Sequence, residues 1–122
     1  MACRCWRYAA ALTDEDVAGR TAALRQILTD GFVFEGPVFE AYGLDDFLDQ
    51  IGLWHPMLPA GTKLRIVGGV QEHHGRLLGR YTYVAPSGEQ LASGVVVAER
   101  ASNGAIARMT GFVDAGAQLP QG

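Results

Sequence analysis

The stretch that decides the fold is KLRIVGGVQEHHGRLLGRYTYV, residues 63–84. Its two runs of branched and aromatic residues, 63–74 and 77–84, are separated by the turn-like His74-Gly75-Arg76. Such runs are typical of β-strands, and a short turn makes them antiparallel neighbours. The paired glycines Gly68-Gly69 lie inside the first run, where they predict a bulge or a sharp bend. The segment therefore predicts a bent β-hairpin.

Two further strands are predicted downstream, at residues 90–99 and 105–114, with turn-like segments before each. Together the four strands form an antiparallel meander. Both faces of the strand at 90–99 are largely apolar, as in strands covered on both sides. One face would line a pocket. Val95 and Val97 on the other face would be an aggregation liability if bare, so we expect a homodimer through the outer sheet face.

The residues before the hairpin predict helices. A short helix is expected at residues 5–12, and a second from the N-cap Thr13 to the stop at Asp30-Gly31. A strand at residues 32–35 separates it from a third helix over 44–55. That third helix carries apolar residues at three- and four-residue steps, at Leu44, Phe47, Leu48, Ile51, Trp54 and Leu58. The expected class is α+β, with a curved antiparallel or mixed sheet wrapped round about three helices.

Length and composition limit the function. The chain has 122 residues, 48% hydrophobic and 19% charged, which suits one folded domain over 1–122 with a loose tail at 115–122. A net charge of -3 provides no basic face for nucleic acid. No apolar run approaches the roughly 20 residues that span a bilayer, and the first dozen residues lack a signal-like apolar stretch. We expect a cytoplasmic protein, with Cys3 and Cys5 reduced.

Four pieces of the sequence carry a resemblance to a known superfamily: LTDGFVFEGP at 28–37, GLDDF at 43–47, EHHGR at 72–76, and NGAI at 103–106 leading to GFVD at 111–114. In this order they resemble the nuclear transport factor 2-like superfamily, which includes ketosteroid isomerases, limonene-epoxide hydrolases and SnoaL-like polyketide cyclases. The resemblance covers nearly the whole chain. It implies a cone-shaped fold with an apolar pocket, and fold alone does not imply function.

The departures from that superfamily bear on activity. The position of the ketosteroid isomerase aspartate base is Gly36 here, the helix tyrosine falls near Leu12, and the strand aspartate falls near Val95 or Val96. Steroid isomerisation by that mechanism is therefore not expected, and the Asp-Arg-Asp set of limonene-epoxide hydrolases cannot be assembled. SnoaL-like cyclases carry an acid-base aspartate near the end of the last strand. The resemblance places Asp114 in that role.

Three residues are catalytic candidates. Asp114 shares a strand face with Phe112, so a pocket-facing Phe112 would bring a carboxylate with a raised pKa over the cavity. The alternative is a solvated aspartate at a strand end. His73 and His74 are adjacent on a strand, so only one can point inward and share protons with a ligand. The alternative is a pair of ordinary histidines near a turn.

Candidate ligand-binding residues are aromatic. Tyr81 and Tyr83 lie on one strand face. If that face lines the pocket, their rings would form an apolar wall and their hydroxyls would orient a polar ligand. Alternatively, the rings pack in the core and only the hydroxyls reach the rim. Trp54 continues the third helix's apolar stripe, and His55 either sits at the cavity mouth or caps that helix. With Phe34 and Phe112, these residues complete the expected site.

Two functions stay open from the sequence. The first is an enzyme of isomerase, cyclase or hydrolase type that acts by acid-base chemistry on a small apolar, oxygen-bearing metabolite. The second is a non-catalytic module of the same fold, either binding a ligand or acting through its outer sheet face. No histidine spacing suits a metal, and neither reading uses a cofactor.

Overall fold

The structure is a computed structural model that describes residues 4–114, with side chains from residue 7 onward. Cys3, the side chain of Cys5 and the expected tail at 115–122 lie outside the described residues. The helices are α1 (Arg4–Leu12), α2 (Val17–Ile27), α3 (Leu44–Trp54) and the 3-10 helix η1 (His55–Met57). The strands are β1 (Leu28–Glu35), β2 (Glu40–Tyr42), β3 (Lys63–His73), β4 (Arg76–Val84), β5 (Gln90–Arg100) and β6 (Ile106–Val113).

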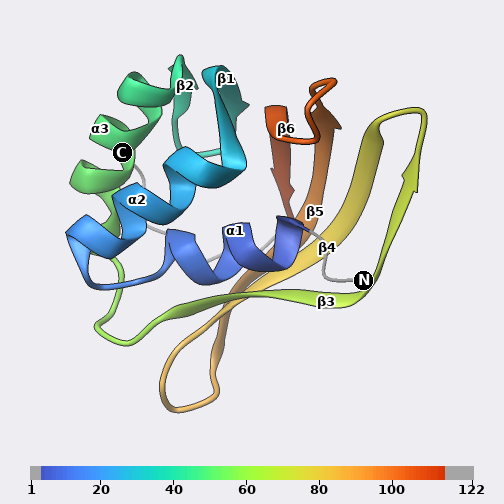
Figure 1. Cartoon of the computed structure of the whole chain (residues 1–122). Coiled ribbons are helices and arrows are strands. Elements are labelled where there is room, and N and C mark those ends of the chain that lie inside the picture. Colours follow the sequence, from blue (N-terminus) through green and yellow to red (C-terminus); the bar gives the residue numbers. More distant parts are fainter. Residues whose placement is uncertain (1–3, 115–122) are drawn as a thin grey trace.

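The strands form one six-stranded sheet in the order β2-β1-β6-β5-β4-β3. The meander from β3 to β6 is antiparallel, as expected, whereas β1 pairs in parallel with β6. The sheet is therefore mixed. In Figure 1 the long strands curve beneath α1, while α2 and α3 lie together beside β1 and β2. This confirms the expected α+β architecture of a curved sheet around three helices.

The bend in β3 lies at the predicted glycines. Val67 pairs with Arg80 and Gln71 with Leu78, so β3 has two more residues than β4 between these pairs. Gly68 adopts a φ of 70°, a left-handed conformation that glycine adopts without a steric penalty. Extra residues in one strand of a pair increase its bend and twist. The Gly68 bulge thus helps the sheet to curve over the helices.

Helix α3 buries its apolar stripe against this curved sheet. Leu44, Phe47, Ile51 and Trp54 are all buried, and they recur at the three- and four-residue steps expected of one helix face. The Phe47 ring meets Phe32 of β1 edge-on, with the ring centroids 4.9 Å apart. These contacts fix the end of α3 against the interior. No helix within residues 4–114 is long and apolar enough to cross a membrane.

The expected N-cap at Thr13 is wrong, because α1 continues to the residue before it. The Thr13 hydroxyl donates to the carbonyl oxygen of Ala9 (3.3 Å) and accepts from the backbone amide of Leu64 (3.2 Å), so it ties the end of α1 to β3. The N-cap of α2 is Asp16, whose carboxylate accepts from the amide of Gly19 at 3.2 Å. Aspartate is a preferred residue at this position.

The first strand also differs from expectation. Helix α2 ends at Ile27, and β1 starts at Leu28 rather than at Phe32. Leu28 pairs with Ile106 of β6, so a partner distant in sequence extends the strand. Strand β2 was not predicted, since its three residues are too few to show an alternating pattern.

Candidate functional site

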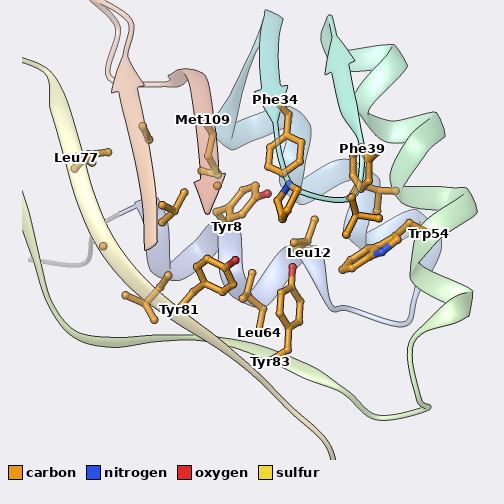
Figure 2. Close-up of a pocket in the computed structure, with 18 residues that line it drawn as sticks. Tyr8, Leu12, Phe34, Phe39, Trp54, Leu64, Leu77, Tyr81, Tyr83 and Met109 are labelled. Atoms are coloured by element: carbon orange, nitrogen blue, oxygen red, sulfur yellow. The ribbon is translucent and has the colours of Figure 1, made fainter. Parts of the chain in front are cut away.

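An apolar cavity of about 70 Å³ lies between the concave face of the sheet and the helices. Its walls come from α1, α3, the segment joining β1 to β2, and every strand except β2. A cavity needs only roughly 10–15 Å³ to hold one water molecule, so this one is large enough for a small organic molecule. Figure 2 shows the side chains converging on it from both the sheet and the helices.

A continuous row of five rings lines the cavity: Phe34, Phe39, Trp54, Tyr83 and Tyr81. We call this set the aromatic belt. Neighbouring ring centroids along it are 5.2, 6.0, 5.7 and 5.8 Å apart in that order. These separations fall within the range of favourable ring–ring contacts. The belt therefore holds its members in place and presents an apolar surface to whatever fills the cavity.

Tyr81 and Tyr83 reach the cavity because alternate residues of β4 share one face. The Tyr81 hydroxyl donates to the carbonyl oxygen of Phe112 at 2.8 Å. Among the described side chains, those of residues 7–114, the Tyr83 hydroxyl has no hydrogen-bond partner, and both hydroxyls point towards the interior in Figure 2. Burial raises the pKa of both phenols, with the Asp114 charge adding to the effect at Tyr81. Both remain neutral near pH 7 and able to hydrogen-bond.

Close packing beside Tyr81 requires glycine at position 94. A Cβ added there would collide with the carbonyl oxygen of Phe112, and it would lie 2.7 Å from the Tyr81 hydroxyl. The absence of a side chain lets the hydroxyl reach that carbonyl across β5. Gly94 thus supports the orientation of one of the few polar groups in the cavity.

Trp54 contributes a buried indole ring to the wall. It is the last residue of α3, and its side chain is buried between Phe39 and Tyr83. Its indole Nε1 has almost no accessible surface, and among the side-chain nitrogens and oxygens of the described residues that are buried to this degree it is the only one without a hydrogen-bond partner. Buried donors in folded proteins nearly always have an acceptor. The Trp54 N–H is therefore an unpaired donor sealed within the packing and not exposed to the cavity.

Four of the candidate residues line the cavity: Phe34, Trp54, Tyr81 and Tyr83. His55 does not. It belongs to a separate hollow with Glu15 and Thr62, on the far side of the α3 terminus. Burial lowers the pKa of His55, and the nearby Arg20 charge lowers it further. His55 is therefore neutral near pH 7.

The expectation that Phe112 faces the cavity is wrong. Its side chain is 59% exposed on the outer face of β6, whereas Met109 and Gly111 line the cavity. Asp114 lies two residues after Phe112, so its side chain points to the same outer side, where it is exposed. Its backbone amide donates to the carbonyl oxygen of Ser93. The two residues share a side, as the alternation indicated, but it is the opposite side from the one expected.

Neither His73 nor His74 reaches the cavity. Both are exposed at the β3–β4 turn, and their Nδ1 atoms lie 2.9 Å apart. His74 adopts a φ of 52°, which turns the chain towards Gly75. Their rings contact each other, so the reading as turn histidines fits their surroundings. Among the side chains of residues 7–114, no group of three or more His, Cys, Asp or Glu could hold a metal ion.

Sequence reasoning missed three cavity residues of note: Tyr8, Phe39 and Met109. Tyr8 lies one turn before Leu12, and this i, i+4 spacing on α1 was an available signal. Phe39 lies in an irregular segment after Pro37, where no periodicity applies. Met109 lies opposite Ala98 across β5 and β6, a register that only the folded sheet defines.

The chemical character of the cavity follows from its walls. None of the described residues that line it is Asp, Glu, His, Lys or Arg. The polar side-chain groups of these lining residues that can face the cavity are phenol hydroxyls. Such a site can bury an apolar molecule and hydrogen-bond an uncharged oxygen, and it offers no ionisable base to a ligand held inside.

The fold has counterparts among solved structures. A SnoaL-like family protein from Agrobacterium tumefaciens strain C58, named provisionally as an isomerase, matches with a TM-score of 0.82 and 22% identity, over 88% of this chain and 92% of that one. A protein of unknown function with a cystatin-like fold from Nostoc punctiforme PCC 73102 matches with a TM-score of 0.70 and 14% identity, over 91% and 86% of the two chains.

A third match has a ketosteroid isomerase-like fold and comes from Catenulispora acidiphila DSM 44928, in complex with trimethylamine. Its TM-score is 0.71 at 9% identity, over 93% of this chain and 91% of that one. No protein-family model and no curated protein matches the sequence. The chain therefore has the nuclear transport factor 2-like fold. Within that fold its neighbours are SnoaL-like and ketosteroid isomerase-like proteins.

Proposed function

We propose that this protein binds a small, uncharged, apolar molecule in the cavity enclosed by the aromatic belt. The supporting observation is the cavity itself, whose walls combine five packed rings with no charged side chain among the described residues that line it. Largely apolar pockets with a few oriented polar groups are typical ligand sites. Burial of an anionic ligand group there would be costly, since none of the described residues in the wall carries a positive charge.

One structural neighbour supports a small ligand. The Catenulispora acidiphila protein of the same fold holds trimethylamine, a molecule of four non-hydrogen atoms, which supports a small ligand and says nothing for an uncharged one, because an aliphatic amine is protonated near neutral pH. Binding of a molecule of that size is compatible with a cavity of about 70 Å³. The cytoplasmic location expected from the sequence is part of this proposal, and it would place the ligand among cellular metabolites.

A matched pair of variants tests the binding. Ala98→Leu adds side-chain volume on the cavity face of β5, whereas Val97→Leu adds it at the neighbouring position on the outer face. Binding of cyclohexanone, followed by ligand-observed NMR, should weaken at least about tenfold in Ala98→Leu and change little in Val97→Leu. Equal binding by both variants, with both still folded by circular dichroism, would contradict a ligand in this cavity.

Acid-base catalysis is the second candidate function, and one observation favours it. The Asp114 charge raises the pKa of Tyr81, so the carboxylate lies close enough to affect a cavity phenol. Against it, Asp114 is exposed outside the cavity. Incubating a copurified ligand with the wild-type protein and with Asp114→Asn separates the two functions. Product formed only by the wild type would support catalysis, and an unchanged ligand in both would support binding alone.

We also propose that the outer face of the sheet pairs with a second copy of this chain. Val67, Arg80, Val95 and Phe112 form a row of paired positions across β3 to β6 on that face. Phe112 is 59% exposed, Val67 49% and Leu78 42%. Exposed apolar groups this close together are typical of an interface. A second copy presents the same row, as a two-fold contact requires.

A further inference from the structure

The Tyr83 hydroxyl bears on the chemistry of the ligand beyond its apolar character. Tyr83 is 8% exposed, and among the side chains of residues 7–114 its hydroxyl has no hydrogen-bond partner. The oxygen is not sealed by packing, because Trp54 Nε1 is the only unpaired side-chain nitrogen or oxygen in that range that lies in a non-exposed residue and lacks accessible surface. In Figure 2 the hydroxyl points into the cavity. A nearly buried polar group therefore faces the cavity with its donor unused.

Neighbouring rings and strands fix the direction of this hydroxyl. The Tyr83 ring meets the Trp54 ring at 73° and the Tyr81 ring at 81°, with the centroids 5.7 and 5.8 Å away. Edge-on contacts of this kind are favourable and hold a ring from two sides. The Tyr83 backbone pairs with Leu64 of β3 and with Ala92 of β5. The hydroxyl therefore has a fixed position in the cavity.

Within the described part of the chain, no wall side chain accepts a hydrogen bond from this hydroxyl. The Tyr81 hydroxyl is engaged elsewhere, since it donates to the carbonyl oxygen of Phe112 at 2.8 Å. Apart from the tyrosines and Trp54, the described lining residues have no side-chain nitrogen or oxygen. Burial raises the pKa of the Tyr83 phenol, so its proton stays in place near pH 7. That proton needs an acceptor from whatever fills the cavity.

We propose that Tyr83 is the specificity-determining residue of the cavity, and that its hydroxyl donates to an acceptor oxygen of the ligand. The ligand class is then an uncharged apolar ketone, ester or ether. A hydrocarbon of the same shape would displace any water that serves the hydroxyl and leave the donor unpaired, which is unfavourable. The acceptor oxygen thus selects among the apolar molecules that fit. This inference rests on the proposed ligand cavity.

Two probes of nearly the same shape test the inference on the full chain. They are cyclohexanone and methylenecyclohexane, in which a CH2 group replaces the carbonyl oxygen. Tyr83→Phe removes the hydroxyl and keeps the ring. Ligand-observed NMR titrations should show that this variant weakens binding of cyclohexanone about 3- to 10-fold relative to its effect on methylenecyclohexane, as for loss of one neutral hydrogen bond.

Tyr81→Phe is the matched control, because it removes a hydroxyl two residues away on the same strand face. That hydroxyl already bonds to Phe112, so this variant should affect both probes alike. Cyclohexanone labelled with carbon-13 at its carbonyl gives a second readout, since a hydrogen bond to the oxygen deshields that carbon. The bound resonance should lie further downfield in the wild type and in Tyr81→Phe than in Tyr83→Phe. A merely structural role of Tyr83 would not move it.

The outcomes separate the two proposals. If both probes bind and Tyr83→Phe weakens them equally, or leaves the carbonyl resonance in place, the donor role is wrong and the ligand cavity stands. An equal loss of preference for the ketone in Tyr81→Phe would also overturn the assignment to Tyr83. If tetramethylammonium binds more tightly than cyclohexanone, the aromatic belt is a cation site, and the inference falls together with the uncharged ligand class. If none of these probes binds, the proposed function itself fails.

Discussion

His55 and Trp54 are consecutive residues, but their side chains lie in two different hollows of the protein. His55 faces the hollow near Glu15, while Trp54 faces the cavity. Partial burial of His55 and the nearby Arg20 charge both lower its pKa below the ordinary value of 6.5. The neutral imidazole is therefore the form that suits the folded protein.

This lowered pKa predicts a pH dependence of stability. The unfolded chain takes up a proton at His55 near pH 6.5, before the folded protein does, so acid favours unfolding. The contribution to stability is fully present above that pH and is lost as the pH falls towards the folded pKa. In His55→Gln, the free energy of unfolding should fall less between about pH 7.5 and about pH 5.5 than in the wild type.

Urea unfolding at both pH values measures this difference. His73 and His74 are present in both proteins, so the comparison reports on His55. An equal loss of stability in the wild type and in His55→Gln would show that His55 titrates alike in the folded and unfolded chains.

At the scale of elements, periodic patterns predicted most helices and strands but not which way their faces turn. The α3 stripe from Leu44 to Trp54 is buried as expected, and Tyr81 and Tyr83 share the cavity face. Phe112 and Asp114 share a side as well, but β6 turns that side outward. A register shift lies between the Glu99–Arg108 and Arg100–Ile106 pairs. A shift of one residue moves the side chains that follow it to the opposite face of the sheet.

Because sequence patterns identify regular elements but not tertiary packing, they revealed only some of the cavity residues. Phe34, Trp54, Tyr81 and Tyr83 could be recognised because each lies in a regular element with a clear apolar face. Phe39 could not, since its position depends on how an irregular segment folds back over α3. The unused donor of Trp54 depends on tertiary packing, and no pattern in one chain shows whether an indole has an acceptor.

The β3 bulge gives a prediction at this scale. Nothing lies within 4 Å of a Cβ placed on either Gly68 or Gly69, and only Gly68 has a positive φ. Gly68→Ala should lower the free energy of unfolding by about 1–2 kcal/mol, since a left-handed conformation is strained for alanine. Gly69→Ala should be neutral or stabilising by less than about 1 kcal/mol. Chemical denaturation of both variants measures this, and equal effects would mean that the Gly68 conformation does not matter.

At the scale of the whole molecule, the sheet has two unlike faces. The concave face encloses the cavity, and the outer face exposes Phe112, Val67 and Leu78. Phe112→Glu would place a charge at the proposed contact between two copies, where burial without a partner is unfavourable. We expect sedimentation velocity at micromolar concentration to show a dimer for the wild type and a monomer for Phe112→Glu.

The control for this prediction is Leu53→Glu, which changes another exposed apolar residue, on α3 and away from the sheet face. It should leave the dimer intact. A wild-type protein that sediments only as a monomer would rule out the proposed pairing, whatever the variants do.

The parallel pairing of β1 with β6 makes closure of the cavity a late event in folding. Helices α1 and α2 and the β3–β4 hairpin can form from segments near one another in the chain. Phe34, however, is held in the cavity wall by a strand whose neighbour carries Ile106 and Met109. During synthesis on the ribosome, β1 emerges long before that neighbour exists. Contacts so distant in sequence slow folding, so the nascent chain cannot enclose the cavity until β6 has joined the sheet.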